Sequence, residues 1–291
     1  MNLDKQLAHF AKKCVRVNAD RWLLTLRNGF DFNLSAMRDD SFLLLDAEIE
    51  VQPEPEPLVA FIERSAELPG NVKLALPSES RRIHLRSEFP LPEDSKDALR
   101  AARYLNAMQC AHAMVHNWTS LDAGGTVCPR SEGGPTDLAG LEEILKEAGW
   151  ESRKRAGGAL RVDLETPGQF FQAEAKRLGE GVRFRVAACS DPDPSTDVRR
   201  SLALYLLEAN AALRYCQGFI EREGSGIAAG FEARIDWMPD SAETGHALAA
   251  LSVACRHCAR ELDVLSKDAP LAGLYWAARG IPFSTKEQAH G

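Results

Sequence analysis

The feature that most constrains the fold is a succession of helix-like and strand-like apolar patterns that occurs twice along the chain. In the first half, spacings of three and four residues predict helices, and strict alternation predicts strands. The order expected there is helix, three strands, helix, two strands, helix. The predicted ranges are 3–14, 22–26, 30–34, 41–51, 58–68, 72–76, 82–89 and 95–118.

The second half has the same expected order. Its predicted elements cover 138–149, 159–165, 169–177, 182–189, 197–214, 216–222, 227–237 and 241–265. Apolar positions of the two halves also correspond when the sequences are superposed. The matched pairs include Leu3 and Leu141, Leu7 and Leu145, Leu24 and Val162, Leu26 and Leu164, Phe32 and Phe170, Ala66 and Ala211, Leu68 and Leu213, and Cys110 and Cys255. We therefore interpret the chain as an internal repeat.

Proline and glycine divide the chain. The stretch PEPEP at 53–57 predicts a connector, because proline lacks a backbone donor, and SDPDPST at 190–196 takes the same place in the second half. The 291 residues allow one large domain or two ordinary ones, and the repeat favours two. We predict a first repeat at 1–120, a Gly-rich linker at 121–136, a second repeat at 137–268 and a C-terminal tail at 269–291.

Charge and hydropathy exclude several classes of protein. The 35 basic and 42 acidic residues give a net charge of −7, and the basic residues form no long patch, which argues against nucleic acid as a partner. The N-terminal segment MNLDKQLAHFAKKC is charged throughout, and no apolar run approaches the ~20 residues that a spanning helix needs. We expect a cytoplasmic protein that does not bind membranes. The seven dispersed cysteines are then expected to be reduced.

The order of elements resembles the type III secretion chaperone fold and the related YbjN-like domains. The stretch closest in character is LALYLLEANAALRYCQGFIEREGSGIAAGFEARIDWMPDSAETGHALAALSVACRHCAREL at 202–262, which residues 58–114 match less clearly. The resemblance implies a five-stranded antiparallel sheet per copy, with helices packed on one side, and a tendency to pair. We therefore expect an α+β protein of two tandem α-β-β-β-α-β-β-α repeats that form a pseudo-dimer within one chain. That chain would itself be a monomer or a homodimer.

The Cys255-Arg256-His257-Cys258 motif is the sharpest local candidate for chemistry. Two thiols at this spacing can bind a metal or form a redox pair, so Cys255 and Cys258 define one candidate site. The pair lies late in a predicted helix, and no second motif completes a four-ligand set. We favour cysteines that serve as packing residues. Cys110 and His112 repeat the spacing of Cys255 and His257, which we interpret as a buried cysteine beside an exposed histidine rather than as a metal site between the repeats.

No catalytic signature is present. The sequence has no G-x-S-x-G motif, and its glycine-containing turns match neither a phosphate loop nor a dinucleotide fingerprint. Paired acids such as Asp39-Asp40 are typical of turns. We predict no enzyme activity and no cofactor. A hydrolase with an unfamiliar motif is a third alternative, which would need a deep polar pocket.

Aromatic residues near the predicted ends of elements are the candidate partner-binding residues: Trp118, Trp237, Tyr275 and Trp276. Such side chains supply a large apolar area at small entropic cost, although packing between repeats or of the tail is the interpretation that we favour for them. The function we expect is a non-enzymatic, chaperone-like module that binds an extended or partly folded protein segment, by strand addition to a sheet edge or in an apolar groove. A metal or thiol redox protein using Cys255 and Cys258 is the alternative. The net negative charge would favour a basic partner.

Overall fold

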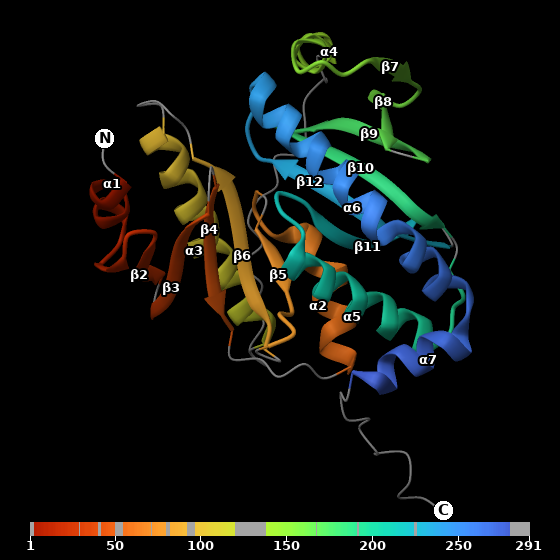
Figure 1. Cartoon of the computed structure of the whole chain (residues 1–291), viewed down its shortest axis with the longest axis horizontal. Helices are drawn as coiled ribbons and strands as arrows, with labels where there is room; N and C mark the ends of the chain where they lie inside the picture. Colours follow the sequence, from red (N-terminus) through yellow and green to blue (C-terminus); the bar gives the residue numbers. More distant parts are fainter. Residues whose placement is uncertain are drawn as a thin grey trace, which may run out of the picture.

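The computed structural model shows an α+β protein with two six-stranded antiparallel sheets and seven α-helices in the part of the chain that it describes (Figure 1). It describes residues 3–28, 30–39, 42–49, 55–70, 72–79, 82–91, 97–119, 138–166, 168–190, 192–223 and 226–279. The linker predicted at 121–136 lies outside these residues.

Apart from a 3-10 turn in the first half and a last helix in the second, the two halves contain the same order of helices and strands. The first half has α1 (Leu3–Phe10), β1 (Lys13–Asn18), β2 (Arg21–Asn28), β3 (Phe30–Asp39), β4 (Phe42–Glu48), α2 (Pro55–Arg64), a 3-10 turn (Ser65–Glu67), β5 (Lys73–Ala75), β6 (His84–Pro90) and α3 (Asp97–Thr119). The second half has α4 (Leu138–Glu147), β7 (Ser152–Arg155), β8 (Ala159–Thr166), β9 (Gln169–Leu178), β10 (Gly181–Ser190), α5 (Thr196–Ala212), β11 (Gln217–Glu223), β12 (Gly226–Ile235), α6 (Ser241–Lys267) and α7 (Ala269–Ala278).

The strand order is also the same in both sheets. The first sheet runs β1-β2-β3-β4-β6-β5 and the second runs β7-β8-β9-β10-β12-β11. This identity of order is consistent with a two-repeat arrangement. The expectation of five strands per sheet is wrong by one strand in each half, because β1 and β7 precede the first predicted strands.

Both missed strands lie at sheet edges and are mostly exposed, so their sequences show little alternation of apolar and polar residues. The apolar spacing predicted a helix through Cys14, but α1 ends at Phe10 and Cys14 lies on β1. Strand β7 has the sequence SRKR and contains no apolar residue that could reveal it. An edge strand that packs on little of the core has no need of the alternation that marks inner strands.

The proline-rich connectors lead directly into helices. Helix α2 begins at Pro55, within the PEPEP segment, since the first turn of a helix does not require the backbone donor that proline lacks. In the second half, the hydroxyl of Ser195 accepts a hydrogen bond from the Val198 amide and caps α5.

Helices cover one face of each sheet. Helices α1 and α3 pack on the first sheet, and α4 and α6 pack on the second (Figure 1). On β2, the side chains of Trp22, Leu24 and Leu26 point into this layer and are buried. Helix α5 lies so close to β11 that a Cβ at Gly218 would approach a Leu206 methyl group to 2.6 Å.

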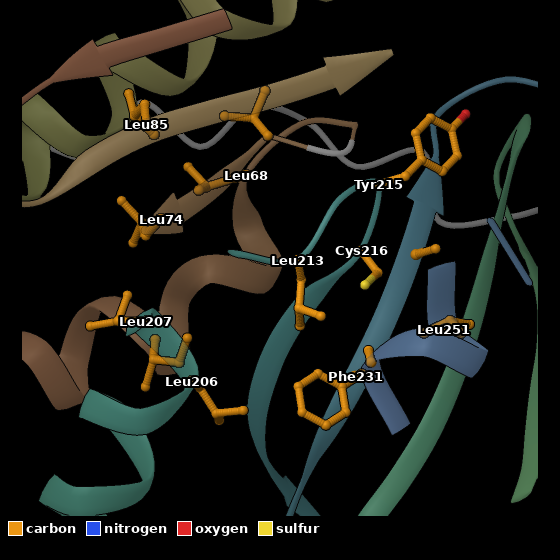
Figure 2. Close-up of a cluster of buried hydrophobic side chains, with 14 of the residues drawn as sticks. Leu68, Leu74, Leu85, Leu206, Leu207, Leu213, Tyr215, Cys216, Phe231 and Leu251 are labelled. Atoms are coloured by element: carbon orange, nitrogen blue, oxygen red, sulfur yellow. The ribbon is translucent and has the colours of Figure 1, made fainter. Parts of the chain in front are cut away.

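The hydrophobic core is continuous between the halves. Helix α5 packs on β5 and α2 of the first half as well as on its own sheet. Figure 2 shows leucines of the first half, such as Leu68 and Leu74, in one buried cluster with Leu207 and Leu213 of the second. The backbone amide of Leu76 also donates to the Leu207 carbonyl at 2.8 Å.

The predicted C-terminal tail contains a helix. Helix α7 packs against α5 and α6, so residues 269–278 belong to the folded second half. Among the described helices, none combines the length and the apolar character needed to cross a bilayer.

Candidate functional site

The structure disperses the four aromatic candidates over three places. Trp118, at the end of α3, is half-buried against Phe61 of α2, and the Arg64 guanidinium lies 4.3 Å from its ring centre. Trp237 follows β12, packs edge-on against Tyr104 at 5.3 Å, and donates from its indole nitrogen to Glu243 at 3.2 Å. Both side chains therefore have partners within the chain.

Tyr275 and Trp276 both attach α7 to the second half. The Tyr275 hydroxyl donates to Glu208 of α5 at 2.5 Å, and burial together with this hydrogen bond raises the tyrosine pKa. Trp276 is only 1% exposed and belongs to the core. In this conformation its ring offers no surface to a partner.

The Cys255-x-x-Cys258 pair lies on the inner side of α6. Cys255 is fully buried, and its burial raises the thiol pKa to about 12. Burial also raises the pKa of Cys258 and that of the neighbouring Cys216. Metal ligation and thiol exchange both need the thiolate, which this environment disfavours. Among the residues that the structure describes, no group of three or more His, Cys, Asp and Glu side chains could hold a metal ion.

The repeated Cys-x-His spacing has different environments in the two halves. On α6, Cys255 is buried and His257 is exposed, as predicted. On α3, Cys110 is only partly buried, and His112 is half-buried with its ring stacked on Phe32 at 4.0 Å. The expectation of an exposed histidine at 112 is therefore wrong.

One histidine and one carboxylate that sequence reasoning did not connect meet on the first sheet. His84 Nδ1 lies 2.6 Å from an Asp46 carboxylate oxygen, and Arg86 pairs with the other oxygen. Burial alone would raise the pKa of Asp46, but the hydrogen bond from His84 and the charge of Arg86 outweigh it and hold that pKa low. The residues come from β4 and β6, and Arg86 also donates to the Ala211 carbonyl of the second half at 2.7 Å. The group therefore connects the two halves.

A buried ion pair lies beside this group. Lys73 of β5 and Glu88 of β6 are 2.9 Å apart, and both are almost fully buried. The loop after α5 closes over them: the carbonyls of Leu213 and Cys216 accept from Lys73, and the Tyr215 amide donates to Glu88 at 3.0 Å. Tyr215 has a positive φ of 56°, an uncommon backbone conformation outside glycine, which this close fit maintains.

Strand edges are the other candidate surfaces, and the four edges differ. Strands β5 and β11, at one end of each sheet, contact α5 and α2 of the opposite half. At the other ends, β1 and β7 each pair with one strand and form the outer edges. An outer edge leaves alternate backbone N–H and C=O groups available to another strand.

Strand β1 combines an outer edge with exposed apolar side chains. Val15 is 43% exposed and pairs directly with Leu23 of β2, which is 47% exposed and faces away from the core. Met37 of β3, 37% exposed, is diagonal to Leu23, and Val17 of β1 is 52% exposed. We call these four side chains the β1 patch. Adjacent exposed apolar residues of this kind are typical of interaction sites.

Strand β7 has the opposite character. Its basic side chains have acidic partners within the second half: Arg153 is 4.0 Å from Asp163, Lys154 is 3.4 Å from Glu142, and Arg155 is 3.2 Å from Glu174. The outer face of β8 carries Arg161, Asp163 and Glu165 between buried apolar residues. Charged side chains on an edge oppose pairing with another chain, so β7 has the features of a protected edge.

Comparison with known proteins yields no relative: no family model, no curated protein and no solved structure matches this chain. The function must therefore be inferred from the surface itself, where the β1 patch combines exposed apolar side chains with an outer strand edge.

Proposed function

We propose that this protein is a non-enzymatic protein-binding module, and that it binds an extended segment of its partner by strand addition to β1. The observation that carries this proposal is the β1 patch: Val15, Val17, Leu23 and Met37 are 37–52% exposed beside an outer strand edge. In strand addition, main-chain hydrogen bonds supply affinity and alternate side chains supply selectivity. The patch offers apolar contacts to every second residue of an added strand.

The arrangement of the other edges supports β1 as the binding strand. Both β5 and β11 contact helices of the opposite half, so an added strand would have to displace that packing. Strand β7 has neutralised charges in place of apolar side chains. The counterpart edges of the two halves thus differ in chemistry, which is expected when one of them has a function and the other is protected.

We further propose that the two halves are tandem copies of one chaperone-like fold, arranged as a pseudo-dimer. The identical strand order supports this, and so does a reciprocal contact between the halves. Arg86 of β6 donates to the carbonyl of Ala211, and Arg234 of β12 donates to the carbonyl of Ala66. Ala66 and Ala211 are positions that the sequence matched independently. The two acceptors are matched positions, whereas the two arginines lie three residues apart in the same superposition. The contacts therefore run in both directions between the halves, as in an approximately isologous interface.

This arrangement fits the resemblance to secretion chaperones and YbjN-like domains, in which paired copies bind a protein segment. In the proposed pseudo-dimer, the interface between the copies is formed by β5, β11, α2 and α5, and the strands farthest from it in each sheet are β1 and β7. Binding at β1 would therefore leave the contacts between the halves unchanged.

Binding of a defined peptide tests the proposed function. A fluorescently labelled peptide Gln-Thr-Val-Thr-Val-Thr-Gln, titrated with the full chain, should show saturable binding by anisotropy. A Val15→Asp/Leu23→Asp variant should weaken it at least tenfold, a loss of about 1.4 kcal/mol, because both apolar contacts are replaced by solvated charges. The matched control is Phe170→Asp, which changes a residue that is 53% exposed on the second sheet and should leave binding unchanged.

The proposal is contradicted if the full chain does not bind the peptide. It is also contradicted if the double variant binds as well as the unaltered chain. Circular dichroism of all variants establishes that they fold, and the substituted side chains are exposed, so folding should be retained.

A further inference from the structure

The β1 edge is basic within an acidic protein. Residues 12–21, KKCVRVNADR, contain Lys12, Lys13, Arg16 and Arg21 against the single acid Asp20, which gives a local charge of +3, whereas the chain as a whole has −7. A local charge opposite in sign to the whole protein affects which segment approaches the strand.

Two of these four basic side chains form ion pairs with described residues, and the other two do not. Lys12 pairs with Asp31 at 2.5 Å. Arg16 pairs with Asp4 at 3.1 Å and also donates to the carbonyls of the turn that follows β1. Lys13 and Arg21 form no ion pair within the described part of the chain.

The two unneutralised charges lie at opposite ends of the β1 patch. Lys13 precedes Val15 by two residues, so both side chains are on one face of β1. Arg21 of β2 is cross-strand from Asn18, beyond Val17, and also from Met37 of the patch. An apolar surface is therefore flanked along the strand by a positive charge at each end.

From this placement we propose that the segment bound at β1 is acidic at both ends of its apolar part, with the pattern acid-x-apolar-x-apolar-x-acid. The proposal rests on strand addition at β1 as the function. The register of β1 shifts between Arg16 and Asn18, and this shift sets Asn18 opposite Arg21. An added strand whose two apolar residues contact Val15 and Val17 would therefore have its acids near Lys13 and Arg21. This proposal differs from the expectation of a basic partner, which followed from net charge alone.

The same charges argue against a second copy of this chain as the occupant. Pairing β1 with β1 of another molecule would bring Lys13 of one copy close to Lys13 or Arg21 of the other, depending on the direction of the strands. Like charges directly opposite one another destabilise a strand pair. Pairing β1 with β7 of another molecule would set the β1 patch beside the sequence SRKR, which offers it no apolar side chain.

Three peptides that differ only at their ends test the proposal. The probes are Glu-Thr-Val-Thr-Val-Thr-Glu, Gln-Thr-Val-Thr-Val-Thr-Gln and Lys-Thr-Val-Thr-Val-Thr-Lys, each titrated with the full chain at low and high salt. The acidic peptide should bind at least fivefold more tightly than the neutral one at low salt and lose this advantage at high salt. The basic peptide should bind most weakly.

Charge reversal at Lys13 identifies the residue responsible. A Lys13→Glu variant should lose the preference for the acidic peptide and gain affinity for the basic one. Arg153→Glu is the matched control on β7 and should change neither. If all three peptides bind equally and Val15→Asp/Leu23→Asp abolishes binding, the acidic pattern is wrong and strand addition stands. If none of the three binds, strand addition itself is wrong.

Discussion

Lys73 shows at the scale of one residue how the two halves are joined. Its side chain is 1% exposed and is surrounded by Glu88 from its own sheet and two carbonyls from the other half. A lysine can be buried to this degree when a carboxylate and hydrogen-bond acceptors replace the water it loses. Its charge is therefore part of the contact between the halves.

Removing this charge should be costly. In a Lys73→Met variant the Glu88 carboxylate is left without its cation, and we expect the free energy of unfolding to fall by about 3–5 kcal/mol in urea at pH 7. The double variant Lys73→Met/Glu88→Leu should recover most of the loss, because no unpaired charge remains. Lys267→Met removes one partner of the exposed pair with Asp263 and should cost less than about 1 kcal/mol. A single variant as stable as the unaltered chain would show that the ion pair does not join the halves.

His112 should make stability depend on pH. Burial, followed by the nearby charge of His116, lowers its pKa from 6.5 to about 4. Between these values the unfolded chain binds a proton that the folded chain does not, so stability is complete above pH 6.5 and is lost as pH falls toward 4. The loss should be about 2–3 kcal/mol, allowing for partial exposure.

Substitution separates this histidine from the others. A His112→Asn variant should show a smaller decrease in unfolding free energy between pH 6.5 and 4 than the unaltered chain. His257→Asn, at the exposed counterpart on α6, should leave the pH dependence as it is. An unchanged profile in the His112→Asn variant would mean that the ring is not held in its neutral form by the fold.

Among the elements, the edge strands mark the limit of sequence-based prediction. Inner strands such as β2 and β8 were predicted because one face is buried and the apolar residues alternate. The match of Phe32 with Phe170 was wrong by one position: Leu24 pairs with Leu34, whereas Val162 pairs with Ala173, so the residue in register with Phe32 is Phe171. A shift of one residue reverses the face, which explains why Phe32 is buried and Phe170 is exposed.

Helix α7 was predicted only as a tail, and its packing gives it a structural role. Asp268 caps the helix by accepting from the Leu271 amide at 2.9 Å, and Ser201 of α5 donates to the Ala272 carbonyl at 2.6 Å. A tail without periodicity in its sequence can still form a helix when another helix buries one of its faces.

Truncation of Trp276 should therefore destabilise the protein and leave peptide binding intact. A Trp276→Ala variant leaves a cavity between α7 and the core, and we expect a loss of about 3–5 kcal/mol in denaturant unfolding. Leu274→Ala, on the 67% exposed side of the same helix, should stay within about 0.5 kcal/mol of the unaltered chain. Loss of peptide binding by a folded Trp276→Ala variant would instead assign Trp276 to the binding surface.

At the scale of the whole molecule, the sequence predicted the order of elements in both halves, apart from β1, β7 and α7, but not the site. Elements that bury one face in the core have a periodic apolar pattern in their sequence. The α+β class and the repeated order of elements were predicted from this pattern. The β1 patch depends on which face of β2 and β3 is left uncovered, and on β1 being an edge. Neither the uncovered face of β2 and β3 nor the edge position of β1 can be predicted from the residue types in these strands. The aromatic residues that we predicted as partner-binding candidates, Trp118, Trp237, Tyr275 and Trp276, pack against other parts of the chain.

The account depends most on β1 as the strand that accepts a partner segment. Hydrogen–deuterium exchange of the full chain, with and without the peptide Glu-Thr-Val-Thr-Val-Thr-Glu, tests this directly, because a new strand protects the outward-facing amides of its neighbour. We predict slower exchange for amides in residues 13–18 and no change for residues 152–155. Protection that appears in β7, or elsewhere in the chain without any in β1, would contradict the account.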